Sequence, residues 1–304
     1  MAPQATPELR RLADGRQGSP LGGQRGHPAA SEILIRNRAV AVNYVEPALQ
    51  TLGPYLFPWV TYPQIFGNDI AGEVVEVGPG VEAFKPGDRV VAHAINVTNN
   101  KPSEGAFQLY TIVSHFMAAP ITDRVSYEQA CVLPLALSTA SCAMYQKDQL
   151  ALELPAVPAR PSTDKTVLVW GGASSVGCCA VQLAVASGYE VVTVASPKNF
   201  GLLETLGAAS VFDYHAADVF EELVGALAGK DCAGRLVTVP GSLRDNEVGR
   251  AVYSDFLGKA LAAGSFACVP EPYVVGEGLE SLQKAFEVCR EGGLSAKKIV
   301  VTLA

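Results

Sequence analysis

Residues 167–177, with the sequence VLVWGGASSVG, run from a hydrophobic segment into glycines and small hydroxyl side chains. A strand followed by such a turn and a helix directs free backbone N–H groups and the positive end of the helix dipole to one point. Glycine lets a diphosphate approach the backbone closely, and serine hydroxyls can donate to phosphate oxygens. The predicted diphosphate-binding residues are Gly171, Gly172, Ala173, Ser174, Ser175, Val176 and Gly177. No lysine stands where a GxxxxGK[ST] loop needs one, which disfavours a nucleoside triphosphate.

The next hydrophobic segment, EVVTVA at residues 190–195, is followed by SPKNF. NAD sites usually present Asp or Glu at this position to bind the adenosine ribose 2′-hydroxyl. Here Ser196 can donate to a 2′-phosphate and Lys198 supplies a cation, with Asn199 in the same turn. Because a carboxylate would repel that phosphate and none is present, the sequence favours NADPH over NADH. Tyr214, which ends a third hydrophobic segment, could pack along the adenosine, although a purely structural tyrosine fits the pattern equally well.

Strands alternate with helices through the second half of the chain, which predicts βαβ units and a parallel sheet. The expected strands are residues 166–170, 190–195, 210–214, 235–239 and 265–269, with helices at 176–188, 199–207, 218–229 and 246–264. Earlier in the chain, short β-prone segments separated by Gly, Pro and Asp predict a partly closed antiparallel sheet or small barrel. Its expected strands are residues 32–43, 70–78, 88–93 and 107–113. A helix at 126–145 and a Pro-rich connector at 152–165 join the two parts, and a helix at 278–293 and a strand at 297–303 follow them.

Composition excludes several classes of protein. The chain has 304 residues, a net charge of −7 and no Lys/Arg-rich stripe, which argues against a surface for nucleic acid or an anionic membrane. No apolar segment is long enough to suggest a membrane span, and residues 1–31 lack the apolar region of a secretory signal. That Gly/Pro/Arg-rich tract is predicted to be disordered. Seven cysteines, none in a CxxC pair, indicate reduced thiols in a cytoplasmic protein.

These features together resemble the medium-chain dehydrogenase/reductase family over residues 32–304. FGNDIAGEVVEVGPGVEAFKPGDRV is similar to the family's catalytic-domain signature, and GGASSVG to its nucleotide turn. AVAVNYVEP, VASPKNF, LGAASVFDY, DNEVGRAVYSDFLGKAL and SAKKIVVTL resemble its zinc-independent fungal branch, which includes trans-acting enoyl reductases that serve polyketide synthases. The resemblance implies an α/β protein with two domains. A GroES-like β-rich catalytic domain would come from residues 32–125 plus 270–304, and a Rossmann-type parallel-sheet domain that binds NADPH from residues 126–269.

Zinc-dependent members of that family hold the ion with Cys, His and carboxylate ligands, because zinc needs such donors in tetrahedral spacing. Asn68 stands where the family signature would place a histidine, and residues 90–113 contain no cysteine. His93 and His115 are single histidines in separate segments of the expected sheet. We therefore predict that the protein holds no metal.

Without a metal a carbonyl is harder to polarise, so the sequence favours NADPH-dependent reduction of an activated C=C, as in an enoyl thioester. The resemblance implies that Asn43 lies near the nicotinamide, where its amide would orient the ring or donate to the substrate. An asparagine that caps a turn is the alternative. The resemblance also implies that Thr139 lies in a helix bordering the nicotinamide, where its hydroxyl would donate to the carboxamide or to phosphate. No general acid is identified, and solvent is an alternative source of the proton.

The chain departs from the family pattern near Lys230. Only residues 230–234 separate a helix from the expected strand at 235–239, so we expect five strands instead of six and about one βα unit fewer. A genuine shortening and an incorrectly spliced gene model would give the same sequence.

The expected function is a zinc-independent enoyl reductase acting on a small-molecule or carrier-bound enoyl substrate, with a polyketide synthase as a partner. One alternative is an NADPH-dependent quinone or alcohol/aldehyde reductase. The other is a redox-inactive binding relative that keeps the fold, which the short second half of the nucleotide domain favours. The sequence leaves both a monomer and a homodimer open.

Overall fold

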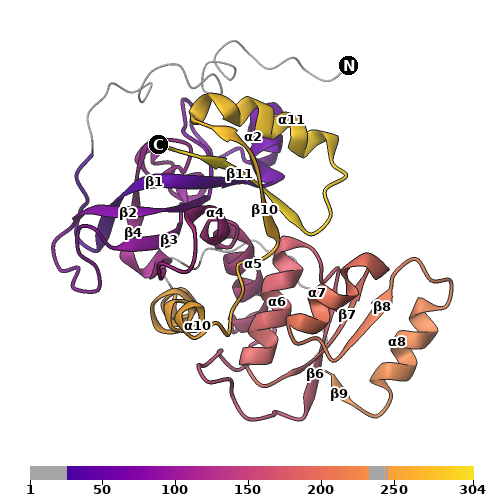
Figure 1. The fold of residues 1–304 in the computed structure, drawn as a ribbon. Helices are drawn as coiled ribbons and strands as arrows, with labels where there is room; N and C mark the ends of the chain where they lie inside the picture. Colours follow the sequence, from indigo (N-terminus) through magenta and orange to yellow (C-terminus); the bar gives the residue numbers. More distant parts are fainter. Residues whose placement is uncertain (1–25, 233–242, 244–245) are drawn as a thin grey trace. The chain divides into compact units, whose positions relative to one another are not determined.

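The computed structural model describes residues 26–304 except 233–242 and 244–245, and it divides into two units (Figure 1). The first unit contains Met1–Leu135 and Glu271–Ala304, and the second contains Ala136–Pro270. In the described part of the chain, no helix combines the length and the apolar character that crossing a membrane requires.

The first unit is rich in strands. Its strands are β1 (Glu32–Val42), β2 (Asp69–Val77), β3 (Arg89–His93), β4 (Tyr110–Ser114), β5 (Ala118–Pro120), β10 (Glu271–Glu277) and β11 (Lys297–Thr302). Its helices are α2 (Val45–Leu56), α3 (Asn96–Asn99), α4 (Tyr127–Ala130) and α11 (Leu282–Glu291), with 3₁₀ turns at Pro102–Glu104, His115–Met117 and Leu279–Ser281. The sheet order is β10-β11-β1-β2-β3-β5, and β4 also pairs with β1. The expected strands at the start of the chain, and the final helix and strand, are therefore confirmed, while β10 was not anticipated.

Strand β1 organises this sheet. The half that contains Ile33 pairs with β4, the half that contains Val40 pairs with β11, and β2 runs along the other edge. Two irregularities interrupt the β1–β2 pairing, and such bulges bend strands and increase their twist. The core that results includes Ile33, Val40, Ile70 and, from α11, Phe286. Helices α11 and α2 contact each other and lie side by side (Figure 1).

The first unit extends further along the chain than expected, to Leu135 rather than to residue 125. Ser126 begins α4 with a capping box: its hydroxyl accepts from the Gln129 amide, and the Gln129 side chain accepts from the Ser126 amide. Helix α4 then packs against β1 and β2. Because α4 and α5 (Pro134–Tyr145) are separate helices, the single helix expected at 126–145 is wrong.

The tract expected to be disordered, residues 1–31, lies mostly outside the described residues. For residues 26–31 the expectation is wrong, because short polar contacts hold them to the sheet. The Ala29 amide donates to the Glu32 carboxylate at 2.9 Å, the Ser31 amide donates to the Pro79 carbonyl at 3.2 Å, and the His27 ring contacts Glu76 at 2.9 Å.

The second unit is a parallel α/β structure. Its strands are β6 (Lys165–Trp170), β7 (Glu190–Ala195), β8 (Ser210–Asp213) and β9 (Asp231–Cys232), in the order β8-β7-β6-β9. Most of α5 belongs to it, together with α6 (Ser175–Ala186), α7 (Phe200–Thr205), α8 (Val219–Leu227), α9 (Glu247–Gly249), a π-helical segment (Arg250–Leu257), α10 (Gly258–Ala263) and a 3₁₀ turn at Pro197–Asn199. The strand pairings among its described residues are all parallel, which confirms the Rossmann-type sheet.

The edge of this sheet beside β6 is described only in part. The expected strand at 235–239 lies outside the described residues, and β9 contributes only Asp231 and Cys232 beside β6. The expected strand at 265–269 is wrong. The Gln182 side chain bonds to both the amide and the carbonyl of Ala267, so that backbone is bound by a side chain instead of a neighbouring strand.

Candidate functional site

The glycine turn, residues 171–177, connects β6 to α6 in the second unit. Gly171 has a φ of +80°, a conformation that glycine adopts without strain, and a side chain there would meet open space. The turn then leads into α6, whose first amides have no acceptor within the helix. The amides of Ser175 and Val176 belong to this first turn, and the Val176 side chain is 38% exposed. The local geometry is thus a helix N-terminus that an anion can approach.

The other two glycines of the turn are required by close packing. A Cβ on Gly172 would lie 2.3 Å from Oγ1 of Thr193 in β7, and that hydroxyl already donates to the Val169 carbonyl. A Cβ on Gly177 would lie 2.3 Å from the Gly171 carbonyl oxygen. Each glycine of the turn therefore has its own physical reason: a positive φ, contact with a neighbouring strand, and contact between the helix and the turn itself.

In the structure Ser174 caps a helix, whereas the sequence predicted that its hydroxyl would donate to phosphate. Its hydroxyl accepts from the Gly177 amide at 3.0 Å and donates to the Gly171 carbonyl at 2.9 Å, so Ser174 caps α6 and its proton is already engaged. Ser175 is half-buried in the first turn of the helix, and Ala173 is also half-buried. The backbone amides of the turn, together with Ser175, are thus better placed than the Ser174 hydroxyl to bind a phosphate.

The residues predicted for the adenosine end gather after β7 and β8. Ser196 follows β7, and its hydroxyl lies 3.0 Å from the hydroxyl of Tyr214, which follows β8 and is 43% exposed. Lys198 is exposed in the 3₁₀ turn after Ser196, and Asn199 ends that turn with its amide on the Ser196 carbonyl. The structure therefore brings Ser196 and Tyr214 together and places a cation in the adjoining turn.

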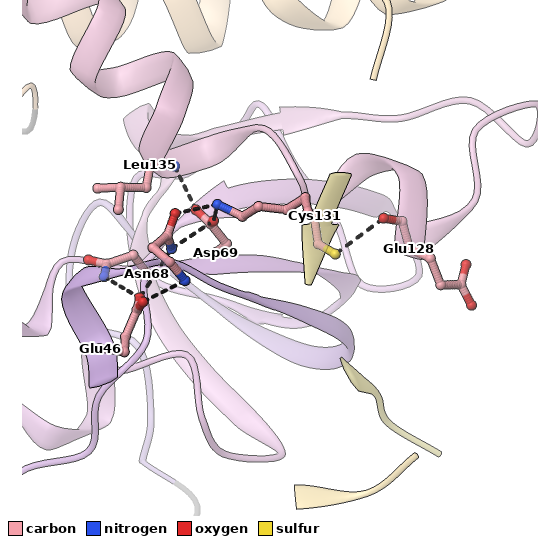
Figure 2. Close-up of polar contacts among 8 residues, drawn as sticks. Glu46, Asn68, Asp69, Glu128, Cys131 and Leu135 are labelled. Carbon is pink, nitrogen blue, oxygen red and sulfur yellow. Dashed lines mark hydrogen bonds and ion pairs between the residues drawn. The ribbon is translucent and has the colours of Figure 1, made fainter. Parts of the chain in front are cut away.

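A second polar site lies in the first unit, where the end of β1, the start of β2 and the start of β11 meet. We call Asn43, Glu46, Asn68, Asp69 and Lys298 the buried polar cluster. Glu46 and Asp69 are fully buried and Lys298 is 5% exposed. The pairing of Val42 with Ile299 places Asn43 and Lys298 next to each other. Figure 2 shows Glu46, Asn68 and Asp69 lying together, with Leu135 beside them.

Asn43 connects the charged groups of this cluster. Its side-chain nitrogen donates to Glu46 at 3.1 Å and to Asp69 at 3.0 Å, and its side-chain oxygen accepts from the Lys298 ammonium. Its backbone amide donates to the other Glu46 oxygen at 2.7 Å. Both N–H groups of an asparagine amide are thereby used. Sequence analysis expected this amide to orient the nicotinamide or donate to a substrate; with this geometry only its oxygen keeps a free lone pair.

Asp69 links the cluster to the first turn of α5. One carboxylate oxygen accepts from the Leu135 amide at 2.6 Å, and the other accepts from Asn43 and, at 2.9 Å, from Lys298. A carboxylate at a helix N-terminus binds otherwise unpaired amides and interacts favourably with the helix dipole. Figure 2 shows the Leu135 amide directed at Asp69.

Burial perturbs the titratable groups around this cluster. Burial, and then the charge of Asp69, raises the pKa of Glu46 from 4.5 to about 7, although the bonds from Asn68 and Asn43 oppose the change. Burial lowers the pKa of His93, which pairs with Asp69 across β2 and β3, to about 4. His93 is therefore neutral near pH 7, while Glu46 is divided between its two forms. Groups with such perturbed pKa values gather at functional sites.

Sequence analysis missed Glu46 and Lys298. The spacing of Asn43 and Glu46 was the available signal, because a carboxylate three residues after a loop asparagine can reach back to its amide. Thr139, which was predicted, is half-buried on α5 in the second unit. Among the described residues, no three Cys, His, Asp or Glu side chains form a group that could hold a metal ion. His93 is buried in β3, whereas His115 begins a 3₁₀ turn instead of lying in a strand.

Comparisons with known proteins identify similar sequences and a similar fold. A model of the alcohol dehydrogenase GroES-like domain matches residues 29–137. Dehydrogenase azaJ of Aspergillus niger is 45% identical to this chain, and the match covers 91% of this chain and 93% of the relative. Trans-enoyl reductase himH of Aspergillus japonicus is 37% identical over 90% of each chain. A solved alcohol dehydrogenase superfamily protein from Novosphingobium aromaticivorans has a TM-score of 0.71 at 20% identity, covering 93% of this chain and 95% of its own, which shows a shared fold.

Proposed function

Because this chain belongs to the medium-chain dehydrogenase/reductase family, we propose that it is an NADPH-dependent reductase of an activated carbon–carbon double bond. Relatives that span most of its length are named as dehydrogenases and trans-enoyl reductases, which supports an oxidoreductase of the enoyl reductase type. The observation that carries the proposal is the glycine turn, a helix N-terminus in which Gly171 has a positive φ and Gly172 and Gly177 allow the turn to pack closely.

The described residues fit NADPH. A Cβ on Gly171 would meet nothing within 4 Å, and Ser175 and Val176 lie in the first turn of α6, so the amides of this segment would hold the diphosphate. Ser196 and Lys198 would hold the 2′-phosphate, because a hydroxyl donor and an ammonium complement its charge. Tyr214 would lie against the adenosine. When bound, NADPH supplies the hydride, and the protein contributes binding, orientation and electrostatics.

The proposed substrate is an α,β-unsaturated thioester or ketone, either free or carried by a polyketide synthase. Its reduction needs hydrogen-bond donors that stabilise negative charge on the carbonyl oxygen. Thr139 offers a half-buried hydroxyl that would donate to the carboxamide or to a phosphate of NADPH. Asn43 contributes through its side-chain oxygen and through the loop that it fixes, because both of its N–H groups are engaged. In this proposal no step involves zinc, and solvent supplies the proton at the α-carbon.

The test combines binding with turnover. Purified protein is first heated with and without saturating NADPH, and it is then given NADPH with enoyl thioesters, quinones or aldehydes while the absorbance of NADPH is followed. We expect NADPH to raise Tm and enoyl thioesters to give the fastest oxidation. Matched runs with NADH report the choice of cofactor.

Each contrary outcome has a distinct meaning. No rise in Tm would reject the nicotinamide site itself. A rise in Tm with oxidation only by quinones or aldehydes would replace the enoyl substrate. A rise in Tm without oxidation by any acceptor would identify a redox-inactive binding relative.

A further inference from the structure

The Lys298 residue is only 5% exposed. Burying an ammonium costs free energy, so its position calls for an explanation. Its ammonium donates to Asp69 at 2.9 Å and to the side-chain oxygen of Asn43. Its neighbour Lys297 is exposed, with its ammonium 5.8 Å from the centre of the Tyr273 ring. Replacing buried ion pairs by apolar residues is often neutral or stabilising, so fold stability alone is a weak reason for this one.

The first consequence of this ammonium is the orientation of the Asn43 amide. An asparagine amide can be turned by half a rotation with little change in shape, so its partners decide which end is oxygen. Lys298 contacts the oxygen, and the Glu46 and Asp69 carboxylates contact the nitrogen. The reversed amide would direct its N–H groups at an ammonium and its oxygen at two carboxylates. One orientation is therefore strongly preferred.

The second consequence concerns the start of α5. The same Asp69 carboxylate that pairs with Lys298 accepts from the Leu135 amide at 2.6 Å. The loop that carries Asn43 is bound at its backbone as well, because the Asn43 amide donates to Glu46 at 2.7 Å. A single ammonium thus stabilises the position of the Asn43 loop and, through Asp69, of the Leu135 amide at the start of α5.

We infer that Lys298 is a positioning residue of the proposed reductase, acting through Asn43 and Asp69 without contacting the substrate. The inference rests on the proposed function, because it takes the side-chain oxygen and the loop of Asn43 to orient the nicotinamide. Geometric errors of about 1 Å at a reacting centre can cost on the order of a hundredfold in rate. Loss of the ammonium should therefore lower turnover, while NADPH affinity, which the glycine turn would set, should be preserved.

The experiment compares Lys298→Met, which keeps the length of the side chain, with Lys297→Met on the opposite face of the same strand. We expect Lys298→Met to lower kcat by roughly ten- to a hundredfold and to leave the Kd for NADPH within about twofold. Lys297→Met should change neither quantity. An equal loss of kcat in both variants, or an unchanged kcat in Lys298→Met, would overturn the inference.

Hydrogen exchange provides a readout that does not depend on activity. In Lys298→Met, peptides covering residues 40–50 and 131–140 should exchange faster than in the parent protein, because their shared anchor is lost. The same peptides in Lys297→Met should match the parent. If the parent oxidises no acceptor, the proposed function fails, yet unchanged exchange in Lys298→Met would still reject the positioning role.

A double variant separates positioning from simple charge compensation. Lys298→Met combined with Asp69→Asn removes both members of the buried pair, so it should fold even if Lys298→Met alone does not. Because the ammonium that orients Asn43 is still missing, kcat should stay low. A return of kcat to the parent value would show that Lys298 only neutralises Asp69, and the inference would fall.

Discussion

The glycine turn and the buried polar cluster are built in different ways. The turn is one continuous segment, Gly171–Gly177, and its binding groups are backbone amides. The cluster gathers side chains from residues 43 to 298, and its groups are carboxylates, amides and an ammonium that bind one another. The turn offers open space to a ligand, whereas the cluster satisfies itself internally. One region is therefore a backbone turn with open space beside it, and the other is a set of side chains that bind one another.

The largest expected effect is the loss of stability when the Asp69 carboxylate of the buried polar cluster is neutralised. Asp69→Asn removes the charge that pairs with the buried Lys298, and leaving such an ammonium uncompensated should lower the free energy of unfolding by about 3–5 kcal/mol. Denaturant unfolding measures the change. Asp123→Asn is the matched control, because Asp123 is 98% exposed in its pair with Arg89 and should matter far less. Similar losses of unfolding free energy in both variants would mean that the buried ion pair stabilises the protein no more than the exposed one.

The second effect concerns pH. Because the pKa of Glu46 is raised from 4.5 to about 7 by burial, its contribution to stability is fully present below pH 4.5 and is lost as the pH rises to about 7. That difference in pKa corresponds to roughly 3 kcal/mol. Burial lowers the pKa of His93 to about 4, so His93 has the opposite effect and lowers stability as the pH falls from 6.5 to 4.

Glu46→Gln isolates the first of these contributions. The parent free energy of unfolding minus that of Glu46→Gln should fall by roughly 3 kcal/mol between pH 4.5 and 7, and the variant alone should become more stable with rising pH up to 6.5. Denaturant titrations at several pH values measure both curves, with exposed Glu287→Gln as the baseline. A difference that does not change with pH would contradict the account of Glu46.

The smallest expected effect is on NADPH affinity at the residues proposed to bind the adenosine. Lys198→Ala removes an exposed cation, so NADPH should bind about tenfold more weakly, as expected for roughly 1.4 kcal/mol. NADH, which has no 2′-phosphate, should bind as before, and it serves as the control within each protein. Calorimetric titrations measure both constants. Equal losses of affinity for NADPH and NADH would show that Lys198 does not bind the 2′-phosphate.

The two regions also differ in how far the sequence predicted them. The glycine turn was predicted because its geometry depends on neighbouring residues: Gly171 must adopt a positive φ, and Gly172 and Gly177 must pack closely. Even there, the engagement of the Ser174 hydroxyl as a cap for α6 was not anticipated, because a serine before a helix can serve a ligand or the helix.

The cluster could not be predicted in the same way. Whether Lys297 or Lys298 faces inward depends on the pairing of β11 with β1, which the local sequence does not specify. The same limit explains the wrong strand at 265–269, since the bonds from Gln182 to Ala267 come from a distant helix. Local segments predicted the domain types well, whereas contacts between distant segments decided the details of the polar site.

The most direct test of the central claim is a calorimetric titration of NADPH into the parent protein and two glycine variants. In Gly177→Ala the new Cβ would lie 2.3 Å from the Gly171 carbonyl oxygen, so the turn must shift; in Gly201→Ala on α7 the new Cβ meets nothing within 4 Å. The account predicts one binding site in the parent, similar affinity in Gly201→Ala, and a loss of at least about a hundredfold, or roughly 3 kcal/mol, in Gly177→Ala. Undiminished binding in Gly177→Ala, or none in the parent, would contradict the claim that this turn binds a dinucleotide diphosphate.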